Sequence, residues 1–113
     1  MSDCLFCRIA SGEIPAQVLY EDEEVMAFRD INPQAPVHIL VIPKNHYTSL
    51  LDLTERDQEL LAHLLLTVKK LGSRSDLEGG FRTVINTGDD GGQWVKHLHL
   101  HVLGGRPMGW PPG

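Results

Sequence analysis

The stretch Lys96-His97-Leu98-His99-Leu100-His101-Val102-Leu103-Gly104-Gly105 alternates histidine with aliphatic residues. Successive side chains of a β-strand point to opposite faces of a sheet, so this alternation predicts a strand over residues 97–103. One face of that strand presents three imidazoles about 7 Å apart, which is twice the rise per residue. The other face is aliphatic and is expected to pack on a core.

The histidine face has three interpretations. It could be the solvent-facing side of an ordinary strand, but such faces usually carry Lys, Glu, Thr and Ser. It could bind a metal, since His-x-His on a strand is a common half-site. It could also serve phosphoryl chemistry, in which one neutral imidazole attacks phosphorus and its neighbours hold the oxygens. The glycine-rich residues 86–93 just upstream can aim backbone N–H groups at an anion, which favours the phosphoryl interpretation.

Length and charge limit the class of protein. The 113 residues and the hydrophobic content of 42% suit one domain over residues 1–113. The net charge of -5 provides no general attraction to nucleic acid or acidic membranes, so neither is expected as a partner. No apolar run approaches the roughly 20 residues of a membrane span, and the N-terminus lacks a signal-peptide pattern. These features predict a cytoplasmic protein.

The remaining pattern predicts an α+β domain. Strands are expected over residues 17–21, 25–30, 38–43 and 81–86, and a short helix over residues 5–11. The strand at 38–43 is apolar on both faces after its first residue, which predicts a central place in the sheet. A long helix is expected from the capping-box-like Thr54-Glu55-Arg56-Asp57 to Gly72, and His63 within it is expected to have no chemical role. The whole is then a five-stranded antiparallel sheet with one long helix and a short N-terminal helix.

Cys4-Leu5-Phe6-Cys7 is a C-x-x-C motif with three possible meanings. A disulfide does not suit a cytoplasmic protein. A redox pair of the thioredoxin type follows a strand, but only three residues precede Cys4. Half of a zinc site needs two further ligands, and histidines elsewhere in the chain could supply them.

The sequence resembles a known family. The run His97-Leu98-His99-Leu100-His101-Val102-Leu103 matches the His-φ-His-φ-His-φ-φ signature of the histidine triad (HIT) superfamily, and the closing Trp110-Pro111-Pro112-Gly113 continues the match. The segments at residues 27–38 and 40–44 are similar to the HINT branch, the histidine triad nucleotide-binding proteins. The resemblance covers nearly the whole chain. It implies a HIT-like fold and a homodimer whose two sheets join through the fourth strand and the long helix.

The resemblance also implies a reaction. His99 is the implied nucleophile, His101 is implied to hold a phosphate oxygen, and His38 completes the catalytic wall. His99 would attack the α-phosphorus of an adenosine-type nucleoside 5′-phosphoramidate, and water would then release the nucleotide from a nucleotidyl-histidine. The implied activity is that of a phosphoramidase acting on a purine nucleoside monophosphate derivative, without a catalytic metal. The alternative is a nucleotide-binding or interaction protein whose catalysis is vestigial.

A nucleotide pocket follows from the same resemblance. The Asp30 carboxylate, which can accept two hydroxyl protons, matches the ribose-binding position. The apolar positions of the implied base pocket are Leu5, Phe6, Ile9, Phe28, Ile31 and Leu40. The implied phosphate-side positions are Asn86, Gly92, Gln93 and Val95, with His99 and His101. Two residues depart from the family pattern: Arg29 stands where relatives commonly carry His or Asn, and Trp94 where many carry a hydroxyl residue, so rate and leaving-group preference are expected to differ.

A structural zinc site is expected at Cys4, Cys7, His46 and His97, a closed Cys₂His₂ set. If the third and fifth strands pair antiparallel, the end of one lies beside the start of the other. This pairing brings His46 near His97 and places His38 toward the far end of the triad. Some HIT relatives have this ligand set, and the alternative is a pair of buried thiols with a free His46.

Overall fold

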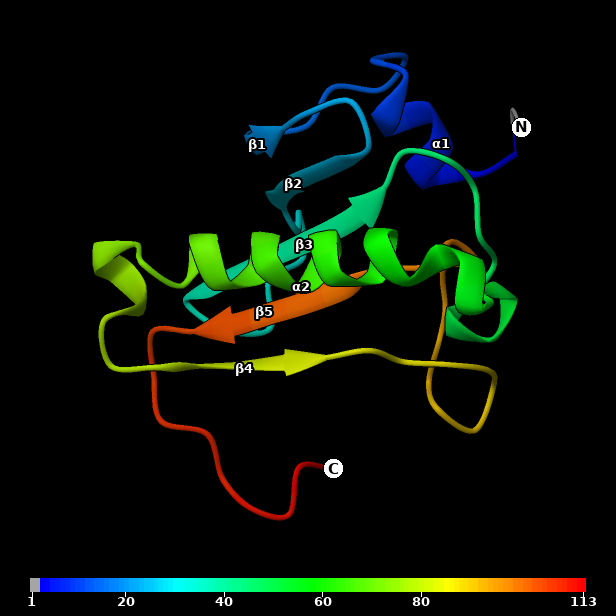
Figure 1. Ribbon diagram of the computed structural model, residues 1–113. Coiled ribbons are helices and arrows are strands. Elements are labelled where there is room, and N and C mark those ends of the chain that lie inside the picture. Colours follow the sequence, from blue (N-terminus) through cyan, green and yellow to red (C-terminus); the bar gives the residue numbers. More distant parts are fainter. Residues whose placement is uncertain (1–2) are drawn as a thin grey trace.

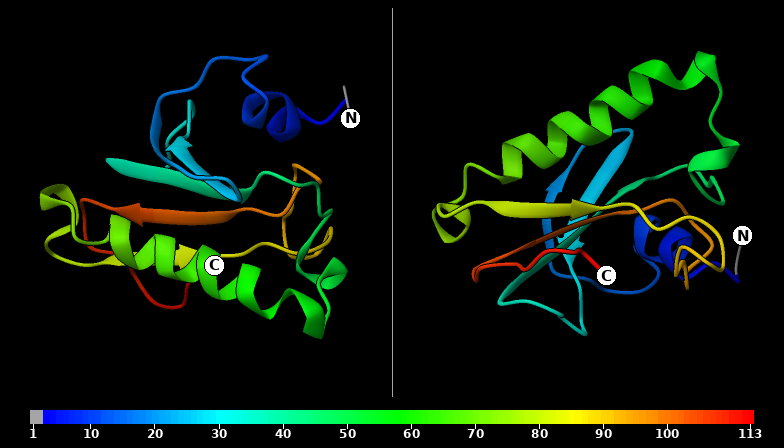
Figure 2. Two further views of the ribbon diagram at one scale, coloured as in Figure 1. Left: turned by 45° about the horizontal axis from the view of Figure 1, so that its top comes forward. Right: turned by 90° about the horizontal axis from the view of Figure 1, so that it is seen from below.

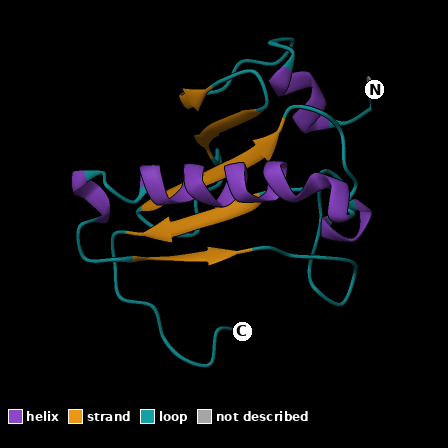
Figure 3. Ribbon diagram, viewed as in Figure 1, coloured by secondary structure: helices purple, strands orange, loops and turns teal. Residues whose placement is uncertain are grey.

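A computed structural model describes residues 3–113. The elements follow in the order α1 (Leu5–Ala10), β1 (Val18–Glu21), β2 (Val25–Arg29), β3 (Val37–Pro43), α2 (Gln58–Leu71), β4 (Phe81–Val84) and β5 (Leu100–Gly104). The strands form one antiparallel sheet in the order β1-β2-β3-β5-β4, with α2 lying across it (Figures 1 and 3). The predicted α+β class, with five antiparallel strands, one long helix and a short N-terminal helix, is confirmed.

The two helices pack on opposite faces of the sheet (Figure 2). The α2 face carries the larger core, built from Leu64, Val68 and Leu71 of the helix and from alternate strand residues such as Ile39 and Val102. The α1 face carries a smaller core of Phe6, Ile9, Met26, Phe28, Leu40 and Ile42. Every residue of β3 is buried, because this strand lies between β2 and β5 with a core on each side, as its apolar sequence predicted.

The last strand is shorter than the histidine alternation predicted. β5 begins at Leu100, opposite Val41, and residues 97–99 pair with no strand. The chain leaves the sheet after Pro43, which has no N–H to donate, and the N–H of Leu98 donates to the Tyr47 carbonyl at 2.6 Å. The aliphatic side chains nevertheless lie on one face as predicted, because Leu98 belongs to the α2-face core together with Leu100 and Val102.

Other boundaries differ by a residue or two. β4 ends at Val84 and not at residue 86, where the chain enters the glycine-rich turn. The capping box at Thr54 and Asp57 is present, but it caps a 3₁₀ turn, Glu55–Asp57, that leads into α2. No helix within residues 3–113 has the length and apolar character needed to cross a bilayer.

Candidate active site and metal site

A cavity of about 470 Å³ opens on the α1 face of the sheet. Its lining brings together most of the residues expected at a nucleotide site. They are Phe6, Asp30, His38, Leu40, Asn86, Gly92, Trp94, Val95, His99 and His101. Asn32 and Gln34 also line the cavity and were not anticipated. The signal for them was available, because both are polar and lie in the loop between Asp30 and His38.

Other expected nucleotide residues lie behind the cavity or away from it. Ile9 and Phe28 are buried in the α1-face core, where Phe28 packs edge-on against Phe6. Ile31 is 97% exposed, so in this chain it makes no wall of the cavity. Gln93 is buried, its side-chain oxygen accepts from the Gly88 N–H within the glycine-rich turn, and its side-chain NH₂ group donates to the carbonyls of Thr48 and Val95. These residues were expected from family positions, which give no indication of which side chains reach the surface.

The register of the sheet sets the histidines beside one another. Leu40 of β3 faces His101 of β5 directly, so His38 lies diagonally from His101 on the same face. The Nε2 atom of His38 is 2.9 Å from Nδ1 of His101 and 3.5 Å from the Asp30 carboxylate. The rings of His99 and His101 lie 4.9 Å apart. His38 is therefore at the His101 end of the row, as predicted from antiparallel pairing.

The proton of His99 is placed by the backbone. The Nδ1 atom of His99 lies 2.7 Å from the carbonyl oxygen of His97. A carbonyl can only accept, so Nδ1 carries the hydrogen and Nε2 of the neutral ring keeps its lone pair. An imidazole held in this way is oriented as a nucleophile or as a base.

Burial keeps these imidazoles neutral. Removal from water lowers the pKa of His99, although its bond to the His97 carbonyl and the charge of Asp30 oppose the shift. Burial, followed by the neighbouring His99 and His38, lowers the pKa of His101 to about 4. The pKa of His38 is also lowered by burial, against the opposing effect of Asp30. All three rings are therefore uncharged near pH 7, the form in which an imidazole has a free lone pair.

The glycine-rich turn forms the wall beside the histidines. The Asn86 side chain donates to the Gly91 carbonyl at 2.7 Å and closes the turn. Gly92 has a φ of 77°, a conformation that favours glycine, and a Cβ on Gly91 would lie 2.2 Å from the Thr87 carbonyl oxygen. The Gly92 backbone borders the cavity without side-chain bulk, and the Gly91 position packs against Thr87 within the turn.

The two residues that depart from the family pattern occupy different places. Arg29 points to the α2 side of the sheet, where its guanidinium lies 4.0 Å from the Asp76 carboxylate, and it does not line the cavity. Trp94 lies at the cavity rim and is 91% exposed. Its indole therefore borders the site without filling it. Of the two departures, only Trp94 is placed to affect a bound ligand directly.

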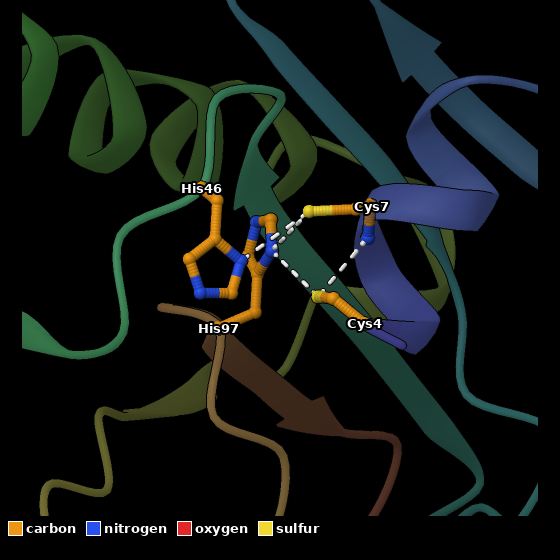
Figure 4. Close-up of side chains that lie close together, drawn as sticks. All are labelled: Cys4, Cys7, His46 and His97. Carbon is orange, nitrogen blue, oxygen red and sulfur yellow. Dashed lines mark hydrogen bonds between the residues drawn. The ribbon is translucent and has the colours of Figure 1, made fainter. Parts of the chain in front are cut away.

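A second cluster lies at the opposite end of the histidine row. Cys4, Cys7, His46 and His97 each offer a ligand atom, and these atoms lie within 4.8 Å of one another (Figure 4). Nδ1 of His97 is 3.2 Å from Sγ of Cys4 and 3.5 Å from Sγ of Cys7, and Nδ1 of His46 is 3.3 Å from Sγ of Cys7. A zinc ion with bonds of about 2.3 Å to sulfur and about 2.0 Å to nitrogen would separate these atoms by roughly 3.5 Å. The four side chains thus suit a closed structural metal site.

The tautomer of His97 supports the same conclusion. Its Nε2 atom lies 2.8 Å from the Pro43 carbonyl and must carry the proton, so the Nδ1 lone pair faces the two sulfurs. The ring is fully buried between the cysteines and β3. Burial, followed by the hydrogen bond and charge of Cys4, raises the pKa of the Cys7 thiol to about 11, so a metal ion would have to displace a proton there.

The chain is therefore a small α+β protein in which a histidine-lined cavity lies next to a Cys₂His₂ cluster. A family model described as the HIT domain matches residues 11–108. The chain belongs to the HIT domain family. Both cysteines precede the matched residues, so the metal ligands are only partly within the family pattern.

Three relatives show how much of the chain is shared. The 14 kDa zinc-binding protein of Zea mays is 53% identical over 114 residues, covering 99% of this chain and 89% of that protein. The crystal structure of a HIT family hydrolase from Legionella pneumophila is 56% identical, with a TM-score of 0.94 over 97% of this chain and 99% of that one. The histidine triad nucleotide-binding protein from Candida albicans is 34% identical, with a TM-score of 0.81 over 96% and 82% of the two chains.

Proposed function

We propose that this chain hydrolyses the P–N bond of adenosine-type nucleoside 5′-phosphoramidates through a nucleotidyl-histidine. The observation that carries the proposal is the tautomer of His99, whose Nε2 lone pair is left free beside the cavity by the bond from Nδ1 to the His97 carbonyl. The similarity to a HIT family hydrolase supports hydrolytic chemistry.

The reaction has two balanced steps. In the first, Nε2 of His99 attacks the α-phosphorus, the P–N bond breaks, and the leaving amine takes up a proton from solvent. In the second, water attacks the phosphorus and gives a proton back to solvent, the bond to His99 breaks, and the nucleoside monophosphate leaves. His101, whose ring lies 4.9 Å from that of His99, would hold a phosphate oxygen, and His38, 2.9 Å from His101, would position it.

The nucleotide is proposed to lie along the cavity. Phe6 and Leu40 form apolar walls suited to a purine, and the Asp30 carboxylate is suited to the ribose hydroxyls. The glycine backbone at residue 92 lies on the phosphate side. The similarity to a histidine triad nucleotide-binding protein supports a purine nucleoside monophosphate or a derivative as the ligand.

Substitution of the nucleophile tests this function. His99→Ala should abolish turnover of adenosine phosphoramidate and leave AMP binding, measured by calorimetry, within a fewfold of wild type, because the nucleophile acts on the barrier. His63→Ala removes a histidine outside the cavity and is the matched control. A His99→Ala protein with most of the wild-type kcat would refute the assignment.

The alternative function is nucleotide binding without useful catalysis. Trp94 favours this alternative, because many relatives carry a hydroxyl residue at its position and an indole cannot relay a proton. AMP binding by the wild-type chain, with no turnover of any phosphoramidate, would select the alternative.

We also propose that the Cys4, Cys7, His46 and His97 cluster binds a structural zinc ion and that no metal takes part in the reaction. The ligand geometry and the similarity to a zinc-binding protein of maize support the first part. Thiol ligands persist in a reducing compartment, which agrees with a cytoplasmic location. Elemental analysis of protein purified without chelator should find one zinc per chain, and its absence would refute the site.

Finally, we propose a homodimer formed through β4 and α2. β4 is an edge strand of the sheet, Phe81 on it is 40% exposed, and Leu65 and Leu66 expose apolar surface on α2. Pairing of two such edges would satisfy backbone groups and cover these side chains. Sedimentation at micromolar concentration should give twice the mass of the chain, and Leu66→Asp should shift the protein to monomer. A wild-type monomer at that concentration would contradict the proposal.

A further inference from the structure

We propose that the backbone N–H of Gln34 sets the tautomers of His38 and His101 and so keeps an N–H donor of His101 facing the cavity. The role assigned to that donor rests on the proposed phosphoramidase function. The tautomers themselves follow from hydrogen-bond geometry and can be measured without any substrate. Gln34 is thus a positioning residue that acts through its main chain.

The Gln34 amide determines which ring nitrogen of His38 carries the proton. The Gln34 amide nitrogen lies 3.0 Å from Nδ1 of His38, and the geometry is that of a hydrogen bond from the amide to the ring. A peptide N–H can only donate, so Nδ1 of His38 must be an acceptor without a hydrogen. The single proton of the neutral ring is therefore on Nε2. The Asp30 carboxylate, 3.5 Å from Nε2, is an acceptor on that same side.

The proton on His38 in turn determines which nitrogen of His101 carries a proton. The protonated Nε2 of His38 lies 2.9 Å from Nδ1 of His101, which must then accept. The neutral His101 ring carries its proton on Nε2, the nitrogen that makes no hydrogen bond within residues 3–113. His99 has the opposite tautomer, since the His97 carbonyl takes the Nδ1 proton. Adjacent imidazoles therefore present a lone pair and a donor, as attack on phosphorus and stabilisation of its oxygens require.

The Gln34 peptide is held in place by the segment that follows β5. Arg106 donates to the Gln34 carbonyl at 3.2 Å, so both polar groups of this residue's backbone are engaged. Gly105 has a φ of 88°, and a Cβ there would lie 2.8 Å from Cβ of Pro36 in the same loop. This close approach packs the loop of residues 32–36 against the chain after β5, and this packing holds the Gln34 N–H in position to donate to His38.

The same amide distinguishes this histidine cluster from the metal cluster. Asp30, His38 and His101 also offer three ligand atoms within 4.8 Å of one another. A metal here would need the lone pair of His38 Nε2, which moves the ring proton to Nδ1 and against the Gln34 N–H. In the Cys4 cluster the Nδ1 lone pair of His97 already faces the sulfurs. The Gln34 amide thus favours a hydrogen-bonded relay over a bound metal ion.

Nitrogen-15 NMR of the imidazoles in the substrate-free, zinc-loaded protein tests the proposal. In wild type near pH 7, His38 and His101 should both be neutral with the proton on Nε2, and His99 should carry its proton on Nδ1. A proton on Nδ1 of His38 or of His101 would overturn the proposal. Failure of the proposed function would appear separately, as an absence of turnover with these tautomers intact.

A matched pair of variants tests the role of the amide. Gln34→Pro removes the N–H, whereas Gln34→Ala keeps it and removes only the side chain that bonds to the Asn32 carbonyl. Gln34→Pro should give His38 a mixture of tautomers and lower kcat by roughly ten- to a hundredfold, the range for a weakened donor to developing charge. Gln34→Ala should keep the wild-type tautomers. Wild-type tautomers in a folded Gln34→Pro protein would contradict the proposal, and if that variant does not fold, the wild-type spectrum alone decides.

Discussion

At the scale of single residues, Trp94 is the side chain most able to make this chain differ from its relatives. Its indole lies at the rim of the histidine cavity and also borders a neighbouring hollow of about 450 Å³ that is lined by Cys4 and His46. The ring does not fill the cavity, because an exposed fraction of 91% places it at the edge. Unlike a hydroxyl group, however, the indole can donate a hydrogen bond but cannot accept one.

Trp94→Ser should therefore raise kcat for phosphoramidates, by up to about a hundredfold if the hydroxyl reaches the phosphate or the leaving amine. The gain should be larger for a bulky amine than for a small one, since the substitution also opens the rim. Trp94→Ala is the control, because it removes the ring without adding a hydroxyl. Equal rates for the two variants would show that only bulk matters, and a loss in both would mean that Trp94 is a packing residue.

At the scale of elements, His63 of α2 forms polar contacts with the β1–β2 hairpin. His63 lies between two carboxylates, with Nε2 2.7 Å from Asp22 and Nδ1 2.9 Å from Glu24. Tyr20 donates to the same Asp22 carboxylate at 2.7 Å. The bond to Glu24, with the bond and charge of Asp22, raises the pKa of His63 against a smaller opposing effect of burial. Both ring nitrogens thus donate, and the imidazolium links the helix to the hairpin.

This link predicts a pH-dependent stability. The pKa of His63 is higher in the folded protein than the unfolded value of about 6.5, so its contribution is complete below about pH 6.5 and is lost as the pH rises through the folded pKa. The partly exposed pair contributes about 1 kcal/mol or less. Thermal unfolding should show that His63→Gln lowers the Tm at about pH 6 and much less at about pH 9. A Tm difference that does not change with pH would contradict this account.

The α1 element lies beside the proposed metal site. A helix of six residues has no stability of its own, and Cys4 and Cys7 tie it to His46 and His97 (Figure 4). Phe6 on the same helix forms a wall of the cavity. If the cluster holds the proposed zinc ion, loss of that ion should loosen both the helix and one side of the cavity.

Cys4→Ser/Cys7→Ser, or removal of the metal with a chelator, should increase amide hydrogen exchange over residues 5–10 and raise the KM for nucleotide substrates more than it lowers kcat. Arg8→Ala is a control on the same helix, since Arg8 pairs only with the exposed Glu13 among the described residues. Unchanged exchange over α1 in the double variant would show that the apolar contacts of Phe6 and Ile9 hold the helix without the metal.

The elements also show how far the sequence is informative. The order of helix and strands and the central place of β3 follow from period and apolar content, and the structure confirms them. The start of the last strand was predicted at residue 97 and lies at Leu100. The alternation of residue types indicates which face of the sheet each side chain takes, but it does not show whether a neighbouring strand is present to pair with. The partner strand β3 ends at Pro43, and the antiparallel register places that end beside the histidines that precede Leu100.

At the scale of the whole molecule, the sequence placed the histidines and the cysteines in their clusters but did not reveal the main-chain groups that orient them. The carbonyls of His97 and Pro43 and the N–H of Gln34 contact His99, His97 and His38 directly, and the residue types at these positions do not show which backbone groups point at a ring. Ile31, expected at the cavity wall, is exposed in this structure for a related reason, since its exposure depends on the path of the loop after β2. The site is thus a product of topology as much as of motif.

The proposed reaction requires that His99 become covalently bound to the nucleotide. The most direct measurement mixes the protein with adenosine phosphoramidate, stops the reaction within milliseconds in base because the histidine–phosphorus bond hydrolyses in acid, and maps the added mass by mass spectrometry. The tryptic peptide that begins at His97 contains all three triad histidines, and fragmentation of that peptide separates them. We predict one AMP moiety on His99 in wild type and none in His99→Ala. Turnover without any adduct, or an adduct on another residue, would rule out the nucleotidyl-His99 intermediate.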